Sequence, residues 1–491
     1  MVLVESFSGI RGIYDKGLDE KVATRYAHSY LQQIQNKNKD RKLKIVIGTD
    51  TRISRDILKN AVIEVLDCDI IDVGIASTPM IEFGVRYFKA QGGIIITASH
   101  NEPYWNGFKF LDKDGAVLRP KDVEEVIKKY NEIKKLDNET FLSKYVYKNK
   151  NPNKISIKKI MKKYNEINNA YSDYVLSFLS KEDKNKLNSL KNSKNFLGHK
   201  KSQSDFFVNS KLKIIIDPNG GTGIIAKTIL EKLDVKVHGI NMRHGIFNRK
   251  VEPTEDSLIY LSSEVRRKKY DFAAGFDCDA DRVEIVTRNG FVSGNKLLAL
   301  IANEILKNAK NKVIVVNDAT SSVVKEIAKK HRAKYIETGV GEIKVVDKIF
   351  DLKAPIGGEG SSSGVIIPPS RCRDGILTII YLLKIIADNK KSLDELIKTL
   401  PQYYNIKKNI KIETKNYEKI KQNLKLYYIK KNCKIKESGE GSLKIFLNDN
   451  SFVWFRASKT EADVLRIIAD SPNKKKAESL IEEALKLIKN K

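Results

Sequence analysis

The sequence predicts an α/β protein built from four domains. The main indication is a repeated pattern, in which an apolar run rich in β-branched residues ends in a turn with glycine or aspartate and precedes a helical pattern. Such runs are typical of largely buried sheets that are covered by helices. The length of 491 residues agrees, since a domain has roughly 100 to 200 residues. The runs lie at 42–50, 92–100, 211–223, 272–282 and 312–322.

The predicted domains follow the points at which the strand pattern restarts. The first three, at 1–165, 166–288 and 289–400, share one succession of strand, turn and helix, which is compatible with an ancient duplication. The fourth, at 401–491, has strand alternation and then an amphipathic helix, so we expect a smaller α+β domain. A Lys/Asn/Ser-rich stretch at 137–210 is predicted to be a linker or a surface insertion.

Composition and charge restrict the possible functions. No apolar run approaches the roughly 20 residues of a membrane-spanning helix. The amino terminus has no secretory signal pattern and the four cysteines form no C-x-x-C pair, so we expect a soluble cytoplasmic protein without a disulfide framework or zinc ribbon. The net charge of +29 predicts attraction to an anion, either nucleic acid or a phosphorylated metabolite.

Functional residues are expected in loops, because open α/β sheets bind ligands beyond the carboxyl ends of their strands. The first such loop contains Ser99, directly after an apolar run and near His100 and Lys109. A serine in this place is positioned like a nucleophile. The alternative is an ordinary strand-end turn in which the serine only caps the backbone.

A second loop, after the predicted strand at 272–276, is rich in carboxylates. Asp277, Asp279 and Asp281 occupy alternate positions, so in an extended backbone they point the same way. They would then offer a hard oxygen site for Mg²⁺ beside the guanidinium of Arg282. Without a cation their mutual repulsion would be costly, although a solvated acidic turn is the alternative.

Two further loops offer groups for a sugar and a phosphate. Glu359 and Ser361 stand in a Gly/Ser-rich loop, and their carboxylate and hydroxyl suit the vicinal hydroxyls of a sugar. Arg456, Ser458 and Thr460 follow a predicted strand, where their side chains and the backbone amides can form a phosphate cradle. Each signal alone is weak, because such loops are common turns.

Taken together and in this order, the four loops resemble those of the α-D-phosphohexomutase superfamily, the phosphoglucomutases, phosphomannomutases and phosphoglucosamine mutases. The resemblance spans nearly the whole chain. Two amino-terminal segments agree with it, the Ser-Gly-Ile-Arg-Gly run at 8–12 and the G-x-D-x-R-x-S pattern at 48–54. The short third loop, followed by Arg373-Asp374-Gly375, is most similar to archaeal-type members.

The resemblance implies a fold and a function. Three similar α/β domains and a smaller α+β domain would surround a central active-site cleft. The enzyme would interconvert hexose 1-phosphates and hexose 6-phosphates of glucose, mannose or glucosamine, through a phosphoserine and a hexose 1,6-bisphosphate intermediate. It would be a monomer or homodimer that binds a phosphosugar. It would bind neither a specific nucleic acid nor a membrane.

The resemblance also implies roles for the candidate residues. Ser99 would carry the phosphoryl group, and Mg²⁺ would be held by one phosphoryl oxygen on Ser99 together with the three aspartates. The third loop would hold sugar hydroxyls, and the fourth would bind the phosphate that is not reacting. Assistance in phosphoryl transfer is expected from Arg11, Lys109 and Arg282.

Two other functions stay open at this level. A phosphatase of the haloacid-dehalogenase type also has an Asp-x-Asp motif after a strand, and Asp277 would then be the nucleophile. A mutase-like scaffold that has lost activity and binds polyanions would account for the charge of +29. Departures from the family pattern bear on two parts of the site: the residues after Glu461 leave the geometry of the phosphate anchor open, and the serine-rich third loop and Glu342 leave the preferred sugar open.

Overall fold

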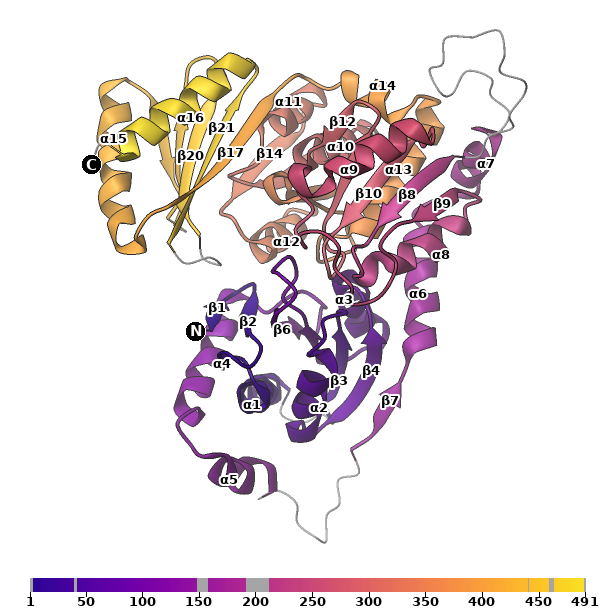
Figure 1. Cartoon of the computed structure of the whole chain (residues 1–491), viewed down its shortest axis with the longest axis vertical. Helices are drawn as coiled ribbons and strands as arrows, with labels where there is room; N and C mark the ends of the chain where they lie inside the picture. Colours follow the sequence, from indigo (N-terminus) through magenta and orange to yellow (C-terminus); the bar gives the residue numbers. More distant parts are fainter. Residues whose placement is uncertain are drawn as a thin grey trace. The chain divides into compact units, whose positions relative to one another are not determined.

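A computed structural model describes residues 3–38, 42–147, 158–190, 212–439, 441–458 and 463–489 (Figure 1). The described residues form four sheets. The mixed α/β class and the carboxyl-terminal sheet domain that the sequence predicts are confirmed. The chain divides into two compact units, the first of Met1–Phe291 and Pro369–Leu393 and the second of Val292–Pro368 and Asp394–Lys491. In the described ranges, no helix is long and apolar enough to cross a membrane.

The first sheet has the strand order β1-β2-β6-β5-β3-β4-β7. Ile45 and Ile47 pack in the core with helices α1, α2 and α4, whereas Val46, one residue out of step, faces Gly84 of α3. Helices therefore cover both faces of this sheet. Its elements are β1 (Val4–Ser6), β2 (Gly9–Ile13), α1 (Glu20–Lys37), β3 (Lys44–Thr49), α2 (Arg55–Val65), β4 (Asp69–Ile75), α3 (Thr78–Tyr87), β5 (Gly92–Ile96), β6 (Trp105–Asp112), α4 (Pro120–Ile133) and β7 (Ile160–Lys162).

The second and third sheets have the orders β12-β11-β10-β8-β9 and β14-β13-β15-β16. The second contains β8 (Lys213–Asp217), α8 (Ile225–Glu231), β9 (Lys236–Gly239), α9 (Glu255–Arg267), β10 (Phe272–Phe276), β11 (Val283–Thr287) and β12 (Gly290–Val292). The third contains α10 (Gly294–Asn308), β13 (Val313–Asn317), α11 (Ser322–Lys330), β14 (Lys334–Thr338), α12 (Glu342–Asp351), β15 (Ile356–Glu359) and β16 (Gly364–Ile366).

The fourth sheet is antiparallel throughout, in the order β17-β21-β20-β19-β18. Its core is formed by alternate strand residues together with apolar residues of α15 (Tyr417–Lys430) and of the last helix. The elements of this part of the chain are α14 (Leu393–Lys398), β17 (Tyr404–Lys411), α15 (Tyr417–Lys430), β18 (Lys434–Glu437), β19 (Leu443–Phe446), β20 (Phe452–Ala457), β21 (Val464–Ser471) and α16 (Lys474–Lys489).

The first three sheets share one core topology. Each contains four strands in the order second, first, third, fourth along the chain: β4-β3-β5-β6, β9-β8-β10-β11 and β14-β13-β15-β16. In each core the first three strands are parallel and the fourth is antiparallel. The turn from third to fourth strand contains Ser99 in the first core, the three aspartates in the second, and Ser361 in the third. Three chemically different loops thus occupy one topological position, as a duplication predicts.

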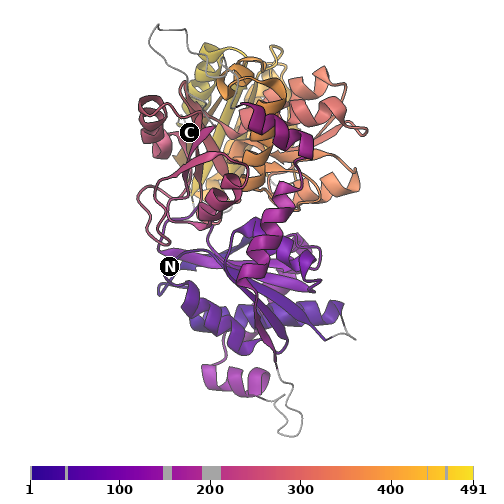
Figure 2. The ribbon, with the colours of Figure 1, turned by 90° about the vertical axis from the view of Figure 1, so that its right-hand side faces the viewer.

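Part of the predicted linker is packed against the first unit. Its described helices are α5 (Asn138–Phe141), a π-helical turn (Leu142–Tyr147), α6 (Tyr164–Leu176) and α7 (Lys181–Ser189). Helix α6 lies along α3 (Figure 2), and α7 packs on α13 (Gly375–Asn389). Lys186 of α7 pairs with Asp388 at 2.9 Å. These helices are therefore structural parts of the unit, while 148–157 and 191–210 of this stretch lie outside the described residues.

Helix α13 belongs to the first compact unit, whereas the residues before it, Val292–Pro368, belong to the second. Its first residue, Gly375, donates its amide to the carbonyl of Ala280, and Asp374 caps the helix at Leu377. The start of this helix is thereby fixed to the loop that contains the aspartates.

Within the second unit, a buried lysine joins the third and fourth sheets. Lys444 of β19 is only 2% exposed, and its ammonium donates to Glu337 at 2.6 Å and to the carbonyl of Asp318 at 2.8 Å. The same ammonium lies 4.1 Å from the ring centroid of Phe452. Phe452 belongs to an apolar cluster that also includes Ala319 of the third domain. The buried ammonium of Lys444 therefore anchors the last domain to the third.

Replacing Lys444 by alanine is expected to lower the free energy of unfolding by about 1–3 kcal/mol, because the carbonyl of Asp318 and one oxygen of Glu337 lose their buried donor. Lys436 provides a matched control, since it is 45% exposed and pairs with the same carboxylate at 2.8 Å. Its alanine variant is expected to stay within about 1 kcal/mol of the parent. Urea unfolding measures both changes, and equal losses in the two variants would contradict the anchoring role.

Candidate active site

Ser99 lies in the turn that follows β5, with its main chain in the left-handed region at φ 51°. For a residue other than glycine, this conformation costs roughly 1–2 kcal/mol. The hydroxyl of Ser99 donates to Oδ2 of Asp277 at 3.1 Å. The fold thus brings the predicted nucleophile into contact with the first aspartate of a loop far along the chain.

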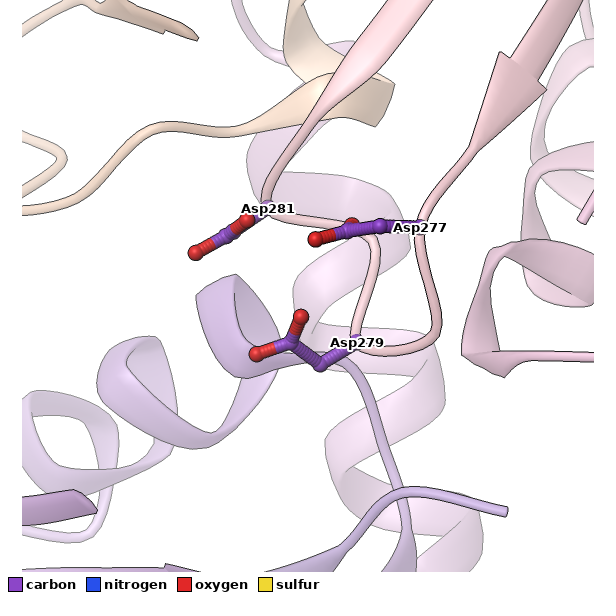
Figure 3. A group of neighbouring side chains, drawn as sticks. All are labelled: Asp277, Asp279 and Asp281. Atoms are coloured by element: carbon purple, nitrogen blue, oxygen red, sulfur yellow. The ribbon is translucent and has the colours of Figure 1, made fainter. Parts of the chain in front are cut away.

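The three aspartates converge on one space. One carboxylate oxygen from each of Asp277, Asp279 and Asp281 lies within 4.8 Å of the others, and Figure 3 shows the three side chains pointing to the same side of the loop. Strand β10 ends at Phe276, and Ala280 between the aspartates has a left-handed φ of 55°. The convergence therefore comes from a tight turn, and the extended backbone assumed from the sequence is wrong at this point.

The donors of this cluster fit a hard divalent cation. All three side chains are buried, and Oδ1 of Asp279 and Oδ1 of Asp281 accept no hydrogen bond from any described residue. Burial raises the pKa of Asp277 well above its usual range, and the charges of Asp281 and Asp279 raise it further. Carboxylate oxygens that are buried and under-coordinated in this way are the ligands that Mg²⁺ prefers.

Basic side chains already offset part of this negative charge. Lys109, on β6, places its ammonium 2.7 Å from Asp279 and 3.2 Å from Asp281. Nε of Arg282 lies 3.9 Å from Asp277 and 3.8 Å from Asp281. Burial by itself would raise the pKa of Asp281, but the cations around it lower that pKa well below its usual range. The site therefore combines a metal-binding set of carboxylates with fixed positive charges.

Arg11 lies close to the same cluster. It stands on β2, next to β6, and donates to the side-chain oxygen of Asn101 in the Ser99 loop at 2.9 Å. Burial and the nearby charge of Arg282 lower the pKa of Arg11 to about 10. Arg11 consequently remains protonated near neutral pH. The structure thus brings together in the first unit all seven residues that the sequence predicts for phosphoryl transfer and metal binding.

Two further residues of the cluster are not among those predicted. Nη2 of Arg373 donates to Asp281 at 2.9 Å, and Arg373 gives the largest of the cationic contributions that lower the pKa of that aspartate. The hydroxyl of Thr78 donates to Asp279 at 2.6 Å. The Arg-Asp-Gly run offered a signal for Arg373. Thr78 stands in the first turn of α3, where the sequence gives no sign of a contact with an aspartate 201 residues away.

The remaining predicted residues lie in the second unit. Glu359 ends β15 and is buried, and its Oε1 accepts hydrogen bonds from Asn317 at 2.9 Å and from the amide of Gly341 at 3.0 Å. Ser361 follows in a 3₁₀ turn (Gly360–Ser362) and is partly exposed. The main chain of Gly341 and the side chain of Asn317 therefore fix the carboxylate at the head of this turn.

Arg456 stands at the end of β20, directly opposite Arg466 of β21. Burial lowers the pKa of Arg456, and the charge of Glu359 acts on it in the opposite direction. The amide of Ser458 donates to the carbonyl of Val464 at 2.7 Å, whereas Thr460 lies outside the described residues. Two adjacent arginines are suited to bind an anion.

Known proteins match this chain over nearly its full length. Models of the phosphoglucomutase/phosphomannomutase α/β/α domains I, II and III match residues 5–137, 191–290 and 293–404. A phosphoglucomutase/phosphomannomutase from Thermococcus kodakarensis is 32% identical, over 98% of this chain and 97% of the relative. A probable phosphoglucosamine mutase from Pyrococcus abyssi is 30% identical, over 91% of this chain and 90% of the relative.

Solved structures show the same fold. The crystal structure of a putative phosphomannomutase from Thermus thermophilus has a TM-score of 0.75 at 21% identity, and the match covers 99% of this chain and 98% of that one. The resemblance to the α-D-phosphohexomutases is confirmed by these matches. From the three matching domain models and the relatives of equal length, it follows that the chain belongs to the phosphoglucomutase/phosphomannomutase family of phosphohexomutase-type isomerases.

Proposed function

We propose that this phosphohexomutase interconverts the 1-phosphate and 6-phosphate of a hexose with Ser99 as the carrier of the phosphoryl group. The observation that supports this most is the hydrogen bond from Ser99 to Asp277, which places a serine oxygen at the edge of the carboxylate cluster. Phosphoryl transfer depends mainly on alignment and on neutralisation of spreading negative charge. A serine oxygen beside buried carboxylates and fixed cations meets both requirements.

The proposed metal ligands are Asp277, Asp279 and Asp281, together with an oxygen of the phosphoryl group on Ser99. Bound there, Mg²⁺ would neutralise charge on the phosphoryl group during transfer. The under-coordinated oxygens of Asp279 and Asp281 support this assignment.

The basic residues of the first unit would act on the transferred group. When a sugar hydroxyl attacks, its oxygen forms a bond to phosphorus, the bond from phosphorus to the serine oxygen breaks, and the hydroxyl releases a proton. Lys109 is our candidate to relay this proton: its neutral amine would accept the proton from the sugar hydroxyl, and the ammonium so formed would return one to the departing serine oxygen, a transfer that a guanidinium, which stays protonated, does not perform. Arg11 and Arg282 would stabilise the charge on the transferred group, with Arg373 holding Asp281 in place.

The second unit would bind the rest of the substrate. Glu359 and Ser361 would hold sugar hydroxyls, and Arg456, Ser458 and Thr460 would bind the phosphate that is not reacting. A hexose 1,6-bisphosphate formed in this way must exchange its two phosphates between the sites before one of them returns to Ser99. The register of β20 and β21, which sets Arg456 directly opposite Arg466, supports an anion-binding place in this unit.

The sugar is proposed to be glucose, mannose or glucosamine. The names of the relatives point to all three, since they include phosphoglucomutase/phosphomannomutase and probable phosphoglucosamine mutase. Incubation with each 1-phosphate, Mg²⁺ and a trace of the matching bisphosphate, followed by identification of the 6-phosphate, distinguishes them. No conversion of any of the three would contradict the proposed function.

The purified protein is expected to carry one phosphoryl group of about 80 Da on Ser99, because an activated serine stores the group between turnovers. Intact-protein mass spectrometry followed by peptide mapping measures it. Incubation with a sugar monophosphate is expected to lower the occupancy by transfer to the sugar. A phosphoryl group on Asp277 would instead favour a phosphatase of the haloacid-dehalogenase type.

A further inference from the structure

Arg52 is a completely buried arginine, 0% exposed, in the turn after β3. A guanidinium has five N–H donors, and each one of Arg52 has an acceptor. Nε donates to Asp50 at 3.0 Å. Nη1 donates to the carbonyls of Glu102 at 2.6 Å and Trp105 at 2.8 Å. Nη2 donates to the carbonyls of Ser99 at 2.8 Å and of Asn101, also in this loop, at 2.6 Å. Three of the five acceptors thus belong to the loop that begins at Ser99, and a fourth, Trp105, is the first residue of β6 directly after it.

Asp50 links this arginine to the other side of the serine. Its Oδ2 accepts the hydroxyl of Thr97 at 2.6 Å as well as Nε of Arg52. The hydroxyl of Thr97 in turn accepts the amide of Ser99 at 2.8 Å. Ser99 is therefore held at its amide by Thr97 and at its carbonyl by Arg52, and both of these residues are fixed by one carboxylate.

We call Thr97 and Arg52, which hold the amide and the carbonyl of Ser99, the clamp. It is needed because the conformation of Ser99 is unfavourable. At φ 51° the main chain lies in a region that residues other than glycine leave unless their surroundings prevent it. A return to negative φ would redirect the side chain and break its hydrogen bond to Asp277. Lysine has three donors on one nitrogen and cannot reproduce the planar fork of Arg52.

A corresponding pair is present in the second sheet. Asp217 ends β8, the counterpart of β3, and pairs with Nε of Arg249 at 2.7 Å. Nη2 of Arg249 donates to the carbonyl of Phe276 at 2.7 Å, directly before Asp277. In both cores, an aspartate at or just after the end of the first strand thus pairs with a buried arginine. Arg52 binds carbonyl groups within the functional loop, and Arg249 binds the carbonyl of Phe276, where the strand before the functional loop ends. The recurrence of the Asp-Arg pair points to a function in loop placement.

We propose that Arg52 is the positioning residue of the phosphoryl-carrying serine, acting through the main chain of the Ser99 loop. The inference rests on the function proposed above, because it assigns to Arg52 the alignment of the oxygen that exchanges the phosphoryl group. Arg249 serves the aspartate loop in the same manner.

The test is Arg52→Lys in the full-length protein, with Arg55→Lys as the matched control. Arg55 lies three residues further on and donates to the carbonyls of Thr51 and Arg52 at 3.3 Å, and among the described residues its guanidinium makes no hydrogen bond to the serine loop. For Arg52→Lys we expect kcat to fall by about 100-fold with KM for the sugar phosphate unchanged, since displacement of a reacting atom by about 1 Å has this effect. The control is expected to retain the parent kcat. A retained kcat in a folded Arg52→Lys variant, or an equal loss in the control, would overturn the proposal.

A crystal structure of Arg52→Lys provides a second readout that does not depend on activity. Ser99 is expected to leave the left-handed region and to lose its hydrogen bond to Asp277. An unchanged φ and an unchanged contact would overturn the proposal. If the parent itself proves inactive towards hexose phosphates, the proposed function fails, and this structural readout alone decides whether Arg52 positions the serine.

Two more variants control for misfolding of Arg52→Lys and for a general effect of losing a buried arginine. If Arg52→Lys does not fold, Thr97→Val removes the other half of the clamp, and the same loss of kcat is expected. Arg249→Lys tests whether disruption of the other buried pair, Asp217–Arg249, gives the same result as Arg52→Lys. Its expected effect is weaker binding of Mn²⁺, measured by electron paramagnetic resonance on unphosphorylated protein, whereas Arg52→Lys should leave this affinity unchanged. Identical profiles for the two lysine variants would overturn the specific role of Arg52.

Discussion

Replacement of Ser99 by alanine is expected to reduce phosphohexomutase turnover by more than about 1,000-fold, because the variant has no oxygen to carry the phosphoryl group. The serine is the one hydroxyl that donates to Asp277 in the described part of the chain. A coupled assay of hexose 6-phosphate formation measures the loss, and intact mass is expected to show no phosphoryl group.

Ser361→Ala is an informative comparison for this experiment. Ser361 lies in the 3₁₀ turn after Glu359 and is proposed to contact the sugar. Its variant is expected to raise KM while the phosphoryl group on Ser99 remains. If Ser99→Ala isomerised hexose phosphates as fast as the parent, the serine would not be the carrier, and the proposed mechanism would have to be abandoned.

The second large effect is expected from the carboxylate cluster. Asp279→Asn should lower kcat by about 100-fold or more, because loss of one charged ligand weakens the cation that neutralises the phosphoryl group. The same variant is expected to bind Mn²⁺ more weakly, as measured by electron paramagnetic resonance. In the parent, chelation with EDTA should abolish turnover, and added Mg²⁺ should restore it.

Asp271→Asn is the matched control for this variant. Asp271 lies just before β10 and is partly exposed, its carboxylate accepts the amide of Lys213 at 2.7 Å, and burial raises its pKa to about 6, so it is a nearby aspartate that does not belong to the cluster. Its asparagine variant is expected to keep the parent kcat and Mn²⁺ affinity. Full turnover of Asp279→Asn after exhaustive chelation would show that the cluster holds no catalytic metal.

The sequence could predict those parts of the site in which a strand and its functional loop are adjacent in the chain. Ser99 and the three aspartates directly follow the apolar runs of β5 and β10, so their place at strand ends is a local property. The resemblance of the loops to a known family then supplied their order and roles. The α/β class follows from the same runs, because their composition is typical of buried strands.

Other parts of the site depend on contacts that no local pattern contains. Thr78 reaches Asp279 across 201 residues, and Arg373 reaches Asp281 across 92 residues. The left-handed turn at Ala280 likewise brings the carboxylates together in a way that alternation along a strand does not describe. Helices α6 and α7 come from a Lys/Asn/Ser-rich stretch, and no local pattern in it indicates that they pack on α3 and α13.

The shared strand order of the first three sheets bears on how sugar preference can change. The turn from third to fourth strand is the variable element of each core, while the ladder hydrogen bonds that fix both strands lie outside it. Exchange of such a turn leaves the supporting sheet intact. Residues 360–363 could therefore be replaced by the corresponding turn of a relative whose sugar preference is known. The turns that contain Ser99 and the aspartates would remain unchanged, because each belongs to another sheet.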